Sequence, residues 1–313
     1  MGTNPCALRI TACRTGVAQV TGGLGPPPLA TIAGMRSPCH DRRRLLGLLA
    51  FGAAGWAAAL EPGSKHLVVG VEATLFAAGL AGRLAEVLAR ETGRAIEWRP
   101  APSGLVLPQL ERGDLDAALT HEPEVEAALG RKNLIHDRRA VAATEMVLVG
   151  PAPRRASKKA PASGDPAGVA GAADGAEALR RIAAAGERGE ALYVACGEPS
   201  GTRHLEQALW RAVGPLPVGA WLRTAAPGPD AALALARELQ AYAIIERGLW
   251  TARGEGSGLA VLVDGDARLA ATYHVMRPLR SNHPAGKLLA GWLAGPNGRR
   301  VVGRFGRGYR VPA

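Results

Sequence analysis

Short apolar runs rich in β-branched residues alternate with amphipathic helical segments along most of the chain after residue 66. The first half predicts strands at 67–71, 96–98, 115–119 and 146–149, and helices at 79–92 and 105–112. Gly93 predicts the end of the first helix. This alternation favours an α/β fold with a largely parallel sheet and helices on both faces.

The alternation stops at 152–168, a polar and basic stretch rich in Pro, Ala and Ser that is typical of a mobile surface loop. It then resumes. The second half predicts strands at 191–195, 241–245, 259–263 and 273–276, and helices at 175–185, 202–213, 230–239, 285–293 and 297–305. The chain is therefore expected to form two α/β parts.

The N-terminal 60 residues do not belong to this pattern. Residues 1–34 show no periodic apolar pattern, and we interpret them as a non-native or disordered extension before a true start at Met35. Residues 35–60 contain three arginines (42–44), an apolar run and small residues suited to cleavage. The segment resembles a twin-arginine export signal and predicts a periplasmic protein. An ordinary secretory signal or an uncleaved anchor are alternatives.

Composition restricts the function classes. The chain is 47% hydrophobic and 21% charged, which is sufficient for one or two substantial cores. Its net charge of +11 suits an anionic partner, but no Lys/Arg stripe is interleaved with aromatic residues, so we expect no nucleic-acid binding. After residue 60 the sequence contains one cysteine, Cys196, which excludes an intramolecular disulfide and a Cys-x-x-Cys metal site there. We expect no metal and no cofactor.

Several motifs, in this order and spacing, resemble one family. They are Gly113–His121 (GDLDAALTH), Asp137-Arg138-Arg139, Ser200-Gly201-Thr202, Glu246–Trp250 (ERGLW) and His283-Pro284-Ala285. Along residues 66–306 the chain is similar to the periplasmic tungstate-binding proteins that feed ABC transporters, within the type II periplasmic-binding fold.

The resemblance implies a two-lobed clamshell in which each lobe is a small mixed sheet flanked by helices. Lobe one would contain residues 66–149 and 275–313, and lobe two residues 150–274. A small anionic ligand, of the tungstate or molybdate kind, would lie between them. The implied partner is an ABC transporter permease. We expect a monomer that binds its ligand and is not an enzyme.

The predicted ligand-binding residues are ones that can supply donors to an oxyanion. Ser200, Gly201 and Thr202 precede a predicted helix, whose N-terminus favours anions. Thr74 and Ser103 precede other helical segments, and Arg138 or Arg139 matches a basic residue of the family. Two simpler readings stay open: Ser200 as a helix cap only, and one of the two arginines in a surface ion pair.

Three residues depart from the family pattern and are candidates for ligand selectivity: Glu72, Cys196 and Arg203. Glu72 stands where the family has a hydroxyl, and its charge would oppose a dianion by about 4 kcal/mol per charge pair at about 4 Å in a moderately polar cleft. Two other functions therefore stay open. One is a ligand-sensing module for a membrane signalling partner with a ligand other than tungstate, and the other is an enzyme using Cys196 and Glu72.

Overall fold

A computed structural model describes residues 66–154, 164–281 and 283–313. The chain divides into two compact units, Met1–Leu60 and Glu61–Ala313, and every described residue belongs to the second. The expected extension at 1–34 and the expected export signal at 35–60 lie outside the described residues. Most of the expected loop at 152–168 also lies outside them.

The first sheet contains five strands in the order β2-β1-β3-β9-β4. They are β1 (Leu67–Glu72), β2 (Ile96–Ala101), β3 (Ala117–Thr120), β9 (Ala270–Pro278) and the first part of β4 (Ile135–Pro151). β1 runs parallel to β2 and β3, whereas β9 runs antiparallel to β3 and β4. The sheet is therefore mixed, which corrects the largely parallel sheet that the alternation alone predicts.

The last part of β4 belongs to a second sheet. There it pairs antiparallel with β7 (Tyr242–Glu246) and β8 (Leu259–Val263). On its other side, β7 pairs parallel with β5 (Tyr193–Ala195), and β5 pairs parallel with β6 (Leu222–Thr224). The change occurs within one peptide unit of β4: Glu145 pairs with Ala270 of β9, and Met146 pairs with Glu246 of β7. A single strand of 17 residues is thus shared by both sheets.

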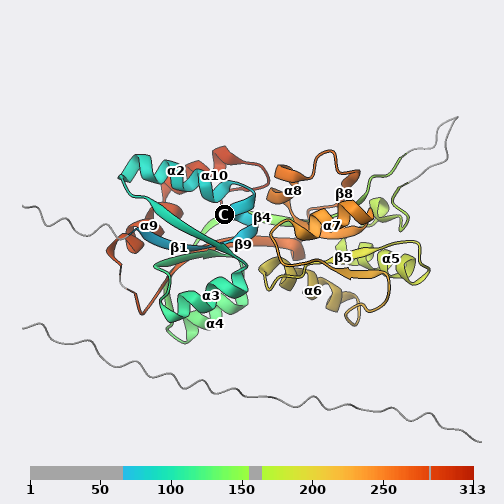
Figure 1. The fold of residues 1–313 in the computed structure, drawn as a ribbon, viewed down its shortest axis with the longest axis horizontal. Helices are drawn as coiled ribbons and strands as arrows, with labels where there is room; N and C mark the ends of the chain where they lie inside the picture. Colours follow the sequence, from blue (N-terminus) through green and yellow to red (C-terminus); the bar gives the residue numbers. More distant parts are fainter. Residues whose placement is uncertain (1–65, 155–163, 282) are drawn as a thin grey trace, which may run out of the picture. The chain divides into compact units, whose positions relative to one another are not determined.

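Helices cover both faces of the first sheet (Figure 1). On one face lie α2 (Leu80–Thr92), α9 (Pro284–Ala294) and α10 (Pro296–Phe305), and on the other α3 (Ser103–Arg112) and α4 (Pro123–Arg131). In α2, buried Leu80, Leu84 and Leu88 recur every fourth residue and form the apolar stripe that packs on the sheet. The helix ends at Gly93, whose φ of 69° suits a residue without a Cβ.

The second sheet is covered in the same way (Figure 1). One face carries α5 (Gly175–Glu187) and α6 (Gly201–Val213), and the other α7 (Ala231–Leu239) and α8 (Arg247–Arg253). Successive residues of β7 alternate between these two cores, because side chains along a strand point to opposite faces. The α/β prediction is confirmed. Short helical turns at Val169–Gly171 and Ala267–Leu269, and the helix α1 (Ala73–Ala77), complete the described elements.

The longest helices described contain 13 residues. A bilayer-spanning helix needs about 20 apolar residues, so no helix of the described part of the chain could cross a membrane.

Candidate functional site

Three of the predicted hydroxyl residues line one small cavity. Thr74 lies in the first turn of α1, while Ser200 and Thr202 lie at the start of α6. All three are buried. The cavity has a volume of about 20 Å³, which is comparable to the space that one water molecule needs. Residues of α1 and of the start of α6, which are distant in the sequence, therefore line one place, where the Thr202 hydroxyl donates to Met146 Sδ at 3.6 Å.

Ser200 also determines where α6 begins. Its backbone is extended, with φ −131° and ψ 163°, and its Oγ accepts a hydrogen bond from the Arg203 N–H at 3.4 Å. This is the N-cap role that the sequence left open. The cap directs the N-terminal end of a 13-residue helix, with its partial positive charge, toward the cavity.

Two glycines allow elements of the two sheets to approach closely beside this cavity. The Gly104 N–H at the start of α3 donates to the Pro199 carbonyl oxygen at 2.8 Å, and a Cβ on Gly104 would stand 2.5 Å from that oxygen. A Cβ on Gly201 would overlap the backbone and ring of His121, which follows β3. A third contact joins His204 Nδ1 to Glu122 Oε1 at 3.5 Å. The start of α3 and the segment after β3 are thus in direct contact with the start of α6 and with the residue before it.

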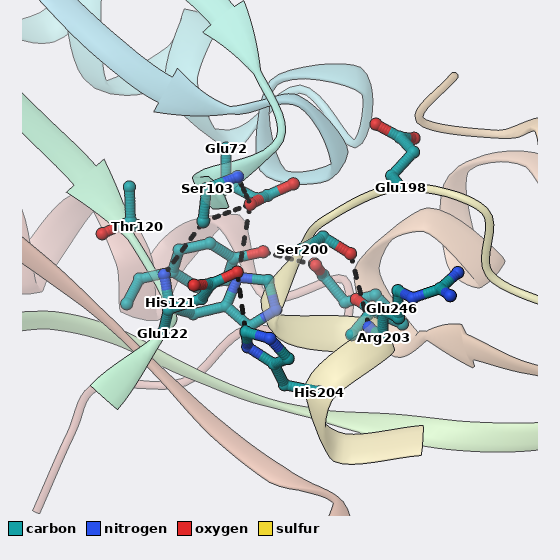
Figure 2. A network of polar contacts seen from close by, with 12 residues as sticks. Glu72, Ser103, Thr120, His121, Glu122, Glu198, Ser200, Arg203, His204 and Glu246 are labelled. Carbon is teal, nitrogen blue, oxygen red and sulfur yellow. Dashed lines mark hydrogen bonds and ion pairs between the residues drawn. The ribbon is translucent and has the colours of Figure 1, made fainter. Parts of the chain in front are cut away.

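Glu72 lies at the end of β1 and is 1% exposed. Its Oε2 accepts hydrogen bonds from the N–H of Ser103, at 2.7 Å, and from the Ser103 hydroxyl (Figure 2). Burial raises the pKa of Glu72 to about 8, and although the bonds from Ser103 oppose this, the nearby Glu246 and Glu198 carboxylates add to it. Ser103 is therefore bonded to Glu72 and is not among the cavity-lining residues.

The predicted arginines do not reach the cavity. The Arg138 Nε donates to Glu126 Oε2 at 2.9 Å, and its terminal nitrogen lies 3.1 Å from His274 Nδ1. Arg139 pairs with Asp137 at 3.4 Å. The expectation that one of the two faces the hydroxyls is therefore wrong, because Arg138 neutralises a buried carboxylate elsewhere and Arg139 is held at the surface.

The three selectivity candidates have different positions. Cys196 lines the cavity, and burial raises the pKa of its thiol. Arg203 instead donates to the Cys196 carbonyl oxygen at 2.5 Å and does not line the cavity. Glu72 is buried and is not among the residues that line the cavity. No basic side chain is among the described residues that line the cavity.

Two acids that the sequence analysis did not select also line the cavity, Glu198 and Glu246. Both oxygens of Glu246 accept hydrogen bonds from tyrosine hydroxyls, those of Tyr273 and Tyr309. Burial nevertheless raises the pKa of Glu246 to about 7. A sequence signal existed, since Glu246 directly follows the predicted strand 241–245 and so had to lie at the end of a sheet.

His121 is a further buried polar residue at this site, and sequence reasoning did not assign it a role. It is 1% exposed, and neither ring nitrogen has a hydrogen-bond partner among the described residues. Its Nδ1 lies 3.8 Å from Glu72 Oε2. Burial lowers the pKa of His121 to about 4, so the ring is neutral at neutral pH. No group of three His, Cys, Asp or Glu side chains in the described part of the chain is arranged to bind a metal.

A family model for bacterial extracellular solute-binding proteins matches residues 67–308, which include the whole site. The chain belongs to this family. It is a family of binding proteins and not of enzymes, in agreement with the expectation from the sequence.

Individual relatives agree with this assignment. The tungstate-binding protein TupA of Peptoclostridium acidaminophilum is 26% identical over 234 residues, covering 73% of this chain and 77% of the relative. The crystal structure of the tungstate ABC transporter from Geobacter sulfurreducens is similar with a TM-score of 0.65 and 26% identity, covering 77% of this chain and 98% of that one. The tungstate-binding protein TupA of Desulfovibrio alaskensis G20 gives a TM-score of 0.63 and 26% identity, covering 79% and 98%. The predicted periplasmic-binding fold is thereby confirmed.

Proposed function

We propose that this protein is the exported binding component of an ABC transporter, and that it captures a small oxyanion of the tungstate or molybdate kind. The observation that supports this most directly is the convergence of Thr74, Ser200 and Thr202 on one cavity at the N-terminal end of α6. The similarity to two tungstate-binding TupA proteins and to a tungstate ABC transporter agrees with it.

The chemistry of these groups suits an oxygen-rich anion. Hydroxyl groups donate hydrogen bonds without bringing a charge of their own, and a helix N-terminus favours negative charge. The cavity of about 20 Å³ is small, and in this proposal the elements on its two sides separate to admit a tetrahedral oxyanion. The contact between Gly104 and Pro199 would then form again around the ligand.

The partner in this proposal is the membrane-embedded permease of the transporter, and the compartment is the periplasm. The arginine-rich segment at 42–44 supports export, and we propose that a monomer carries out the binding. The division into lobe one (66–149 and 275–313) and lobe two (150–274) is part of the same proposal. The strand pairing supports two lobes but favours boundaries a few residues earlier, because Met146–Val149 pair in the second sheet and Ala270–His274 pair in the first.

A second candidate function is favoured by one specific observation. Glu198 and Glu246 line the cavity, and no basic side chain among the described residues does so. Carboxylates accept hydrogen bonds and repel anions. This composition favours a ligand other than tungstate that carries an amine or hydroxyl group, delivered to a transporter or to a membrane signalling partner.

Calorimetry distinguishes the two functions. The protein is titrated with tungstate, molybdate, sulfate and phosphate, and separately with small amino acids and hydroxy acids. We expect oxyanion binding that Ser200→Ala weakens by roughly 10- to 100-fold, because one hydrogen bond to a charged group contributes about 1.5–3 kcal/mol. Ser257→Ala is the matched control, since Ser257 is also buried but bonds to Gly254 away from the cavity. Binding of amino acids with no oxyanion binding would support the second function.

A further inference from the structure

The Glu72 carboxyl has one oxygen with hydrogen bonds and one without. Both bonds that it accepts, from the N–H and the hydroxyl of Ser103, go to Oε2. Oε1 accepts none from the described residues, and Figure 2 shows it pointing away from Ser103, toward the side where Ser200 and Glu198 lie. Glu246 differs, because tyrosine hydroxyls donate to both of its oxygens. Oε1 of Glu72 is thus the carboxyl oxygen free to hold a proton.

No positive charge offsets Glu72. Within the described residues, the one basic side chain at ion-pair distance is His121, and its ring is neutral at neutral pH for the reason given above. The other titratable groups around it come from four places: Glu246 at the end of β7, Glu198 before α6, Tyr273 on β9 and Tyr309 near the C-terminus. The glutamates are acidic and the buried phenols stay neutral, so none of the four brings a positive charge.

An oxyanion bound by Ser200 and Thr202 would enter this uncompensated acidic environment. A bare carboxylate and a bare oxyanion repel each other in a buried site. One proton between them converts the repulsion into a hydrogen bond, whether the proton begins on Glu72 or on the ligand. Binding and protonation are therefore thermodynamically linked.

We propose that Glu72 holds its oxyanion through one shared proton on Oε1, so that the protein binds the ligand with Glu72 neutral. This proposal rests on the proposed oxyanion-binding function and states how the site accepts a dianion without an arginine. The ligand class that fits is a small oxyanion that either accepts a hydrogen bond from Glu72 or carries its own O–H group.

The test is calorimetry of the full chain with sodium tungstate from pH 6 to pH 9.5, in two buffers of different ionisation enthalpy. Tungstate itself stays deprotonated over this range, so any proton taken up binds to the protein. We expect a nearly constant affinity up to about pH 7 and a loss approaching about tenfold per pH unit above pH 8, with proton uptake rising toward one per ligand.

The decisive variant is Glu72→Gln, whose amide donates a hydrogen bond at every pH. We expect its tungstate affinity to vary less than about threefold between pH 6 and pH 9.5, without proton uptake. Glu206→Gln is the matched control. Glu206 is also buried with a pKa raised to about 7, and it accepts hydrogen bonds from the Tyr193 hydroxyl and the Cys196 N–H. This control should keep the pH dependence of the wild type.

The outcomes separate the two proposals. Tungstate binding with no pH dependence and no proton uptake overturns the shared proton and leaves the transport function standing. The same holds if Glu72→Gln keeps the wild-type pH dependence. An absence of binding to tungstate, molybdate, sulfate and phosphate at every pH overturns the oxyanion function itself. If Glu72→Gln does not fold, Glu72→Thr takes its place, because that variant also lacks the ionisable carboxyl and should lose the proton uptake.

Discussion

Gly201 and His121 pack so closely that a Cβ atom on Gly201 would overlap the carbonyl oxygen of His121. Gly201 starts α6 in the second sheet's helical layer, and His121 follows β3 of the first sheet. The absence of one side chain therefore allows the hydroxyls of α6 to reach the site.

The first prediction concerns this contact. Gly201→Ala should keep α6 away from His121, leave the protein folded and weaken oxyanion binding by at least about tenfold. Calorimetry measures the affinity and thermal unfolding checks the fold. Gly82→Ala is the control, because Gly82 lies within α2 and a Cβ there meets no neighbour within 4 Å. Unchanged affinity in Gly201→Ala would show that the close approach is not needed for binding.

The second prediction concerns stability without ligand as the pH rises. The folded-state pKa of Glu72 is about 8, against an ordinary value of 4.5, and those of Glu122 and Glu246 are about 7. The folded form therefore binds more protons, and the stability linked to these groups is complete below pH 4.5 and is lost as the pH rises to about 8. Each such proton changes the free energy of unfolding by about 1.4 kcal/mol per pH unit.

Protonation of His121 has the opposite effect on stability, because burial lowers its pKa from the ordinary value of 6.5 to about 4. This effect is confined to pH values below about 6.5. We therefore expect the melting temperature to fall from pH 6.5 to pH 8.5, and to fall less in Glu72→Gln. Thermal unfolding in buffers of equal ionic strength measures both. A melting temperature that rises over this interval would contradict the buried, protonated state of these glutamates.

The third prediction concerns selectivity. Glu72→Thr removes the acid and places a hydroxyl where the resemblance to tungstate-binding proteins implies one. At pH 9.5, where the wild-type carboxyl is ionised, we expect this variant to bind tungstate at least about tenfold more tightly than the wild type, which is about 1.4 kcal/mol. The difference should shrink at pH 6, where the wild-type carboxyl is neutral. Equal or weaker binding at pH 9.5 would show that Glu72 does not exclude the dianion.

The fourth prediction uses Cys196, which lines the cavity and whose thiol has a raised pKa. Only the thiolate reacts readily with iodoacetamide, so alkylation at pH 7.5 should be slow in the folded protein and should become fast in denaturant. Bound ligand should slow it further. Peptide mass spectrometry gives the rate at residue 196 itself. An alkylation rate that ligand does not change would place the ligand away from this cavity.

Much of the fold could be predicted from local patterns. The helix at 79–92 was predicted within one residue, because its leucines recur at helical spacing and Gly93 ends it. In contrast, β4 was predicted only at 146–149, although it begins at Ile135. Its first part contains Asp137, Arg138 and Arg139, which do not look like a strand. Pairing with β9 makes it one, and this long-range contact has no local signal.

The residues of the site also divide into those that local patterns predict and those that depend on long-range contacts. Ser200 and Thr202 could be placed because a Ser-Gly-Thr segment before a helical pattern has one local meaning, the start of that helix. The destination of Arg138 could not be predicted, because its partners are Glu126 on α4 and His274 on β9, the second 136 residues away in the sequence. The positions of long charged side chains depend on tertiary contacts that a single sequence does not display.

The strand β4 has a mechanical consequence. It passes from one sheet into the other between Glu145 and Met146 with paired residues on both sides, so its backbone is hydrogen-bonded through the transition. If one sheet rotates against the other during ligand capture, the motion would therefore twist a hydrogen-bonded strand and would not reorient an unpaired loop. Among residues 144–147, the amide hydrogens that face β9 or β7 should accordingly exchange slowly with solvent, both with and without ligand. The paired strand β4 would resist this twisting, and its resistance would contribute to how rarely the site opens.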